Sequence, residues 1–323
     1  MPETVNDRPV AIGATPSASV SGTAPKGGAG AAVGSAWIRM LRPRQWMKNF
    51  FILLPLLFSG RATDPGFGIR AIAAFAIFCV LASGVYAFND VIDRESDQAH
   101  PVKKLRPVAS GLISPGTALA TAFVLLLGAV TAAFLLSRNV GVIAVTYLVI
   151  NVFYGLYLKK IVIVDVFAIA SFFVLRMLAG AAAVQVTPSV WLLLCGGLLA
   201  LYLGFAKRRH ELVLLGTDSA DHRAVLSEYT MPFLDQLSVV LLAVTVVSYI
   251  MYTVESETSR QVGSSALSYS TVFVLYGVLR YLYLVHRREG GNPAETLLTD
   301  KALLADVVLW GLYCAVVLYR PFA

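Results

Sequence analysis

The sequence predicts an all-α integral membrane protein, with nine transmembrane helices bundled around a cytoplasm-facing cavity. Composition is the first observation behind this prediction: 57% of the 323 residues are hydrophobic and only 14% are charged. A soluble domain carries about 25% charged residues. The second observation is a series of apolar stretches separated by polar loops, many of them close to the ~20 residues that cross a bilayer. Two of these loops, 89–114 and 207–233, are long and charged, and they suggest a cap over one cavity.

The apolar stretches give the expected spans. They are Gln45–Ser59, Ile69–Phe88, Gly116–Ser137, Val140–Leu158, Val162–Val184, Val190–Ala206, Leu234–Val254, Tyr269–His286 and Ala302–Tyr319. The first is short and contains Pro55, but a tryptophan and four basic residues beside it are typical of an interfacial anchor. These anchor residues are Trp46, Arg39, Arg42, Arg44 and Lys48.

The chain divides into two unequal parts. Residues 1–34 are rich in Ala, Gly, Ser, Thr and Pro, so we expect a disordered N-terminal tail. Residues 35–323 hold every apolar stretch and form the expected transmembrane catalytic domain.

Orientation follows from the basic residues. With the N-terminus and alternate loops on one side, that side carries nineteen Lys and Arg residues and the other five. The positive-inside rule therefore predicts a multi-pass protein of the cell (inner) membrane, with an active site facing the cytoplasm. The net charge of +7 then reflects cytoplasmic loops and anionic lipid or phosphate partners, and no nucleic acid is expected.

The stretch Asn89–Asp97 directly follows an apolar span and is the strongest functional signal. Asp90, Asp93 and Asp97 are three and four residues apart, so they share one face of a helix. Hard cations such as Mg²⁺ bind carboxylate oxygens together with substrate phosphates. We therefore predict a magnesium site here, the alternative being a solvated acidic loop that caps a helix.

Basic residues follow these aspartates. Lys103 and Arg106 suit phosphate contact, although positive-inside anchoring explains them equally well. At the end of the sixth span, Lys207 and Glu211 share a helix face and Arg208 lies one position round. Asp218 and Asp221 could complete a second metal or phosphate half-site, and the alternative is a solvated loop.

Polar residues inside expected spans are costly and often functional. Arg176 lies eleven residues beyond Asp165, about 16 Å deeper at 1.5 Å per residue. It is expected to face the bundle interior and position an anionic ligand, or else to form a buried structural ion pair. Asn151 and Tyr154 are candidates for lining the cavity, although a tyrosine near a span end is also usual structurally.

The pattern Asn89-Asp90-x-x-Asp93-x-x-x-Asp97 at the end of the second span resembles the UbiA family of membrane prenyltransferases. The resemblance covers about residues 40–322. Two stretches, Arg42–Asn49 and Gly204–Leu212, look like the branch of that family that transfers phosphoribose from phosphoribosyl pyrophosphate to decaprenyl phosphate. The resemblance implies a helical bundle, Mg²⁺ at the aspartates, pyrophosphate release, and a role in making an arabinan precursor for the cell wall.

Residue roles follow from the resemblance together with the motifs. Asp90, Asp93 and Arg176 are the expected catalytic residues, and Asp90, Asp93 and Asp97 the expected metal ligands. The expected substrate-binding residues are Lys48, Asn89, Lys103, Arg106, Asn151, Tyr154, Tyr202, Lys207, Arg208, Glu211, Asp218 and Asp221. The expected partners are phosphoribosyl pyrophosphate, a polyprenyl phosphate lipid and the membrane, and a homo-oligomer is also allowed for.

One departure from the family pattern bears on the donor. The family's second acidic motif has aspartates four apart, whereas Asp218 and Asp221 are three apart. A weaker second motif beside Lys207 and Arg208 suits a donor with one pyrophosphate and a further phosphate. The alternatives are a prenyltransferase acting from a prenyl diphosphate on an aromatic acceptor, and a lipid or small-molecule transporter.

Overall fold

Eight helices in this computed structural model are long and apolar enough to cross a membrane. The structure describes residues 28–215, 224–255, 265–287, 296 and 299–319, and within these it contains helices but no strand. The long helices are α3 (Pro65–Ile92), α5 (Pro115–Leu136), α6 (Arg138–Leu156), α7 (Val164–Ala183), α8 (Val190–Leu215), α10 (Met231–Glu255), α12 (Thr271–Arg287) and α14 (Lys301–Tyr319). The shorter elements are α1 (Gly28–Leu41), η1 (Pro43–Ile52), α2 (Leu54–Phe58), α4 (Arg94–Ala99), η2 (Lys103–Leu105), η3 (Leu158–Lys160), η5 (Ala224–Glu228) and η6 (Ser265–Ser270). The prediction of an all-α membrane protein is confirmed.

The first expected span is not one continuous α-helix. It consists of the ten-residue 3₁₀-helix η1 followed by the five-residue α2. Prolines explain the break, because Pro43 begins η1 and Pro55 lacks the backbone N–H that a continuous helix would need. A 3₁₀-helix rises about 2.0 Å per residue, so the ten residues of η1 extend over about 20 Å, further than ten residues of an α-helix would.

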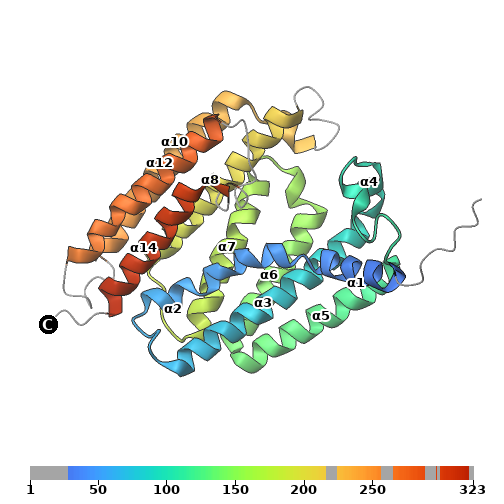
Figure 1. The fold of residues 1–323 in the computed structure, drawn as a ribbon, viewed down its shortest axis with the longest axis horizontal. Coiled ribbons are helices and arrows are strands. Elements are labelled where there is room, and N and C mark those ends of the chain that lie inside the picture. Colours follow the sequence, from blue (N-terminus) through green and yellow to red (C-terminus); the bar gives the residue numbers. More distant parts are fainter. Residues whose placement is uncertain (1–27, 216–223, 256–264, 288–295, 297–298, 320–323) are drawn as a thin grey trace, which may run out of the picture.

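This first segment runs antiparallel to α3. The indole Nε1 of Trp46 donates to Ser83 Oγ at 3.0 Å, and Asn49 Nδ2 donates to Cys79 Sγ at 3.2 Å. Figure 1 shows α1, η1 and α2 lying along α3. The helix α1 begins at Gly28, inside the stretch that we expected to be tail. Residues 1–27 lie outside the described residues, so their disorder stays a prediction.

Side-chain caps fix where the long helices begin. Asp64 accepts from the backbone N–H of Gly66 at 2.7 Å at the start of α3. Ser114 accepts from Thr117 at 3.1 Å before α5, and Ser137 accepts from Val140 at 3.1 Å before α6. These hydroxyls and this carboxylate satisfy backbone donors that have no partner inside the helix.

The helices pack as two neighbouring groups, with α3, α5, α6 and α7 in one and α8, α10, α12 and α14 in the other (Figure 1). Phe78, Tyr147 and Phe172 lie in the core of the first group. Leu242 and Tyr281 lie in the core of the second. Because the long helices alternate in direction, α3, α6 and α8 finish where α7 begins. We call this end of the bundle the aspartate end.

Close packing between η1 and α7 gives a first prediction. A Cβ added to Gly180 would lie 1.9 Å from the backbone oxygen of Ile52. We expect Gly180→Ala to destabilise the fold by ~1–3 kcal/mol or more, because neither backbone can yield easily. Thermal unfolding in detergent measures the effect. Gly128→Ala is the control, since nothing lies within 4 Å of its added Cβ. Equal melting temperatures for the two variants would contradict the packing.

Candidate functional site

Asp90 is the most deeply buried carboxylate of the acidic motif. It lies near the end of α3 with 1% of its surface exposed. Its Oδ1 accepts from Arg42 and lies 3.5 Å from Arg106 Nη1, whereas its buried Oδ2 has no hydrogen-bond partner. Arg42 precedes η1 and Arg106 follows η2, so one carboxylate joins three segments of the chain.

The other two aspartates are also paired with cations. Asp97, at 2% exposure, accepts from Arg106 Nη1 at 2.6 Å. Asp93 is more open, with 34% of its side chain exposed, and its Oδ1 lies 3.2 Å from Nζ of Lys159 in η3, just after α6. The motif therefore forms an ionic cluster with Arg42, Arg106 and Lys159, and it is not a solvated acidic loop.

A magnesium ion fits the chemistry of this cluster. Among the described residues no three acidic, histidine or cysteine side chains are grouped so that they could hold a metal ion by themselves, and the three aspartates are instead paired with Arg42, Arg106 and Lys159. Mg²⁺, however, usually takes only one or two carboxylates and completes its shell with water and phosphate oxygens. The unpartnered Oδ2 of Asp90 is an oxygen donor of the required kind. Asn89, the preceding residue, has its Oδ1 next to Gly155 of α6.

Positive charge gathers beside the aspartates. Lys48 of η1 is partly buried, and the charges of Lys207, Arg176 and Arg42 act on it. Lys207, half exposed near the end of α8, lies 4.0 Å from Glu211. Like charges repel one another, so the cation group formed by Lys48, Arg176 and Lys207 favours an anion nearby.

Arg176 is held by neutral partners. It is 3% exposed, and it donates to Asn49 Oδ1 at 2.6 Å, to the Phe172 carbonyl at 2.9 Å and to Tyr147 Oη at 2.8 Å. The alternative of a buried ion pair is wrong for the described residues, because none of these partners is a carboxylate. The charge of Arg176 is therefore not cancelled by its contacts.

Arg208 has a different environment from the one we expected. It is 1% exposed, and its Nε donates to Asp165 Oδ2 at 2.8 Å while its Nη1 donates to Glu211 at 2.5 Å. The prediction that Arg208 contacts a substrate phosphate is not supported, because two carboxylates already neutralise its guanidinium. Glu211 serves this ion pair as well as the i,i+4 contact with Lys207.

Tyr202 also lies away from the aspartates. Its ring packs edge-on against Tyr281 with centroids 5.6 Å apart, in the core of the second helix group. Asn151 donates to the Tyr147 carbonyl at 2.8 Å, and the Tyr154 ring packs against Phe172. Lys103 is exposed in η2. Asp218 and Asp221 lie outside the described residues.

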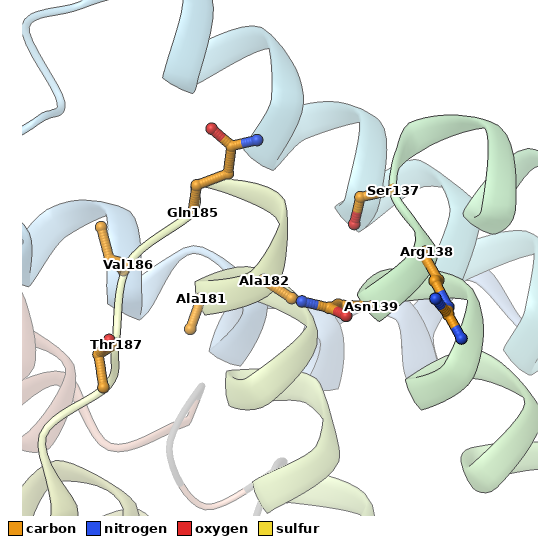
Figure 2. Close-up of a pocket in the computed structure, with 8 residues that line it drawn as sticks. All are labelled: Ser137, Arg138, Asn139, Ala181, Ala182, Gln185, Val186 and Thr187. Carbon is orange, nitrogen blue, oxygen red and sulfur yellow. The ribbon is translucent and has the colours of Figure 1, made fainter.

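A pocket at the opposite end of the bundle is separate from this site. It has a volume of about 320 Å³ and lies between the α5–α6 turn and the end of α7 (Figure 2). Its lining residues are Ser137, Arg138, Asn139, Ala181, Ala182, Gln185, Val186 and Thr187. This pocket is therefore not the cavity that we expected beside the aspartates.

Sequence reasoning passed over three residues of the site. Arg42 and Lys159 pair with Asp90 and Asp93, and Asn49 holds Arg176. The sequence alone predicts that Arg42 is an interfacial anchor. A usable signal was that each of the three lies in a polar stretch at or near the end of an expected span, on the same side as the aspartates.

Comparison with known proteins identifies the class. The model of the UbiA prenyltransferase family matches residues 50–305, which is more than half of the chain. The chain belongs to the UbiA prenyltransferase family.

Two relatives of the chain, each about 30% identical to it, have the same enzyme name. The chain is 31% identical over 285 residues to a decaprenyl-phosphate phosphoribosyltransferase of Corynebacterium glutamicum, covering 86% of this chain and 85% of the relative. It is 30% identical over 277 residues to a decaprenyl-phosphate phosphoribosyltransferase of Mycobacterium tuberculosis, covering 84% and 91%.

Solved structures confirm the fold. A UbiA homologue from Archaeoglobus fulgidus bound to GPP and Mg²⁺ superposes with a TM-score of 0.65 at 17% identity, covering 88% of this chain and all of that one. A structure described as a digeranylgeranylglyceryl phosphate synthase gives a TM-score of 0.64 at 16% identity, covering 90% and 99%.

The buried pair of Arg208 and Asp165 gives a second prediction. We expect Arg208→Met to destabilise the protein by ~3–5 kcal/mol, because it leaves a buried carboxylate without its cation. The double variant Arg208→Met/Asp165→Asn should recover much of that loss, since the fully buried carboxylate is then gone and Glu211 is partly exposed and keeps Lys207 nearby. Thermal unfolding measures both, with Lys207→Met as the half-exposed control. A double variant less stable than Arg208→Met would refute the ion-pair account.

Proposed function

We propose that this chain transfers phosphoribose from phosphoribosyl pyrophosphate to decaprenyl phosphate, releasing pyrophosphate. The observation that carries the proposal is its similarity, over more than four fifths of the chain, to relatives named for that activity. The site supports it, because one acidic motif lies beside a group of cations. The enzyme would be a magnesium-dependent glycosyltransferase of the inner membrane, open to the cytoplasm, and its product would serve arabinan synthesis.

The donor's pyrophosphate suits the aspartate cluster. Asp90, Asp93 and Asp97 would hold Mg²⁺, with Asn89 in support, and the bound ion would neutralise the departing pyrophosphate. Arg42, Arg106 and Lys159 form ion pairs with these carboxylates. Their positively charged side chains therefore lie where phosphate oxygens can contact them. Arg and Lys beside a departing pyrophosphate stabilise the charge that develops on it.

The donor's other phosphate and the lipid phosphate suit the cation group. Lys48 has no hydrogen bond or ion pair among the described residues, and the half-exposed Lys207 has its Nζ 4.0 Å from Glu211 Oε1. The lipid phosphate is already anionic near neutral pH, so the attack on the anomeric carbon needs positioning more than a general base. Arg176 would attract the phosphates through its positive charge without touching them, because its buried guanidinium already donates to Asn49 and Tyr147.

A second candidate is transfer of a prenyl chain from its diphosphate to an aromatic acceptor. It is favoured by the fold shared with a homologue bound to GPP and Mg²⁺. Radiolabelled phosphoribosyl pyrophosphate incubated with polyprenyl phosphate and purified protein separates the two, since only the proposed function yields labelled lipid. A transporter, the third class considered, would release no pyrophosphate in the same assay.

Asp93 gives a third prediction. We expect Asp93→Asn to reduce phosphoribosyl transfer by ~100-fold or more, because losing a metal ligand costs at least as much as losing its supporting residues. The labelled-lipid assay measures transfer, and gel filtration checks folding. Asp64→Asn, at the other end of α3, is the matched control and should keep its activity. Full activity of Asp93→Asn would remove Asp93 from the metal site.

Lys207 gives a fourth prediction. We expect Lys207→Ala to raise the KM for phosphoribosyl pyrophosphate at least about tenfold, because a charge-assisted contact contributes ~1.5–3 kcal/mol. The kcat should change less, since the contact lies away from the bond that breaks. Lys301→Ala, an exposed lysine where α14 begins at the same end of the bundle, is the control. An unchanged donor KM in steady-state assays would exclude Lys207 from the phosphate site.

A further inference from the structure

The turn between α6 and α7 has an unusual backbone. The N–H of Val164 donates to the carbonyl of Val162 at 2.7 Å, which closes a three-residue turn around Ile163. Ile163 has φ 69° and ψ −47°, close to the rare and strained form of the γ-turn. A β-branched residue at positive φ persists only where its surroundings hold it there.

Tyr229 supplies that restraint from a distant part of the chain. The N–H of Ile163 donates to Tyr229 Oη at 2.6 Å, and the same hydroxyl donates to Asp165 Oδ1 at 2.9 Å. Tyr229 is 4% exposed, and its ring packs against Phe205. Burial raises the pKa of Tyr229 to about 12, so its hydroxyl keeps the proton that it donates.

Both ends of this turn lead to charged groups of the site. On the α6 side, η3 carries Lys159, whose Nζ lies 3.2 Å from Asp93. On the α7 side, Asp165 pairs with Arg208, and Arg208 pairs with Glu211, the i,i+4 neighbour of Lys207. The Tyr229 hydroxyl therefore contacts the middle of a series of interactions that runs from the aspartate cluster to the last turns of α8.

We propose that Tyr229 is a positioning residue, whose hydroxyl holds the Ile163 turn so that Lys159 is presented to Asp93. Tyr229 lies between η5 and α10, eight residues after Asp221 in the sequence, and so links the end of the charged stretch 207–233 to the first acidic motif. It acts through the turn and not by touching substrate. The inference rests on the proposed function in one respect, that the affected ligand is the pyrophosphate-bearing donor.

The test compares Tyr229→Phe, Lys159→Met and the double variant in the full chain, with Tyr269→Phe as the exposed tyrosine control. Phenylalanine keeps the ring and removes only the hydroxyl. Hydrogen–deuterium exchange of peptides covering residues 158–166 reports on the turn without any substrate. Steady-state transfer assays give KM for phosphoribosyl pyrophosphate and kcat separately.

We expect Tyr229→Phe to speed exchange in this peptide, to raise the donor KM about tenfold, and to change kcat less than about threefold. Lys159→Met should raise the donor KM by a similar factor. The donor KM of the double variant should rise no more than about tenfold, because both changes remove the same contact. Ile163→Gly, which relieves the strain, should lessen the effect of Tyr229→Phe, because glycine adopts this φ readily.

Unchanged exchange in Tyr229→Phe overturns the proposal, as does a double variant whose donor KM rises about a hundredfold. A fall in kcat and stability with the donor KM unchanged assigns Tyr229 to packing alone and also overturns it. If the wild-type chain makes no labelled lipid, the proposed function fails instead. Hydrogen–deuterium exchange in the turn and around Asp93 then still shows whether the Tyr229 hydroxyl restrains these residues.

Discussion

The carboxylate of Asp90 is the constraint on which the rest of this structure depends. A carboxylate at 1% exposure near the end of an apolar helix must be paired, because an isolated charge in such a place is very costly. Arg42 meets it from the first segment and Arg106 from the loop that follows. The pairing sets the first segment antiparallel to α3, and Trp46 and Asn49 then reach Ser83 and Cys79.

Two buried arginines show how local partners decide what an intramembrane charge can do. Arg208 meets two carboxylates, so its charge is cancelled and it joins α7 to α8. Arg176 meets an amide, a carbonyl and a phenol, so it keeps its charge while its donors are satisfied. The positive potential beside the aspartates therefore comes from Arg176, Lys48 and Lys207, whereas Arg208 contributes rigidity.

Hydropathy and charge sufficed to predict the eight long helices of the described residues and the place of the acidic motif in the sequence, because an apolar run of membrane length has few other structures open to it. They could not predict which side of each helix packs against which neighbouring helix. Lipid tails are as apolar as a helix interface, so the pattern along α8 does not show that Tyr202 turns toward Tyr281. The partner of Arg208 lies 43 residues earlier in the chain. The ten-residue 3₁₀-helix was hidden because its composition resembles that of an interfacial anchor.

Ion pairing also explains how three carboxylates can lie together at a membrane surface. Without cations they would repel one another, and burial would penalise their charged forms further. Arg42, Arg106 and Lys159 offset part of both costs, since each lies against an aspartate. In the proposed reaction, these carboxylates would hold Mg²⁺, and Arg42, Arg106 and Lys159 lie where they can contact the phosphate oxygens of the donor. Because each of these basic side chains has an aspartate partner, the charges of the site would be paired both before pyrophosphate binds and after it leaves.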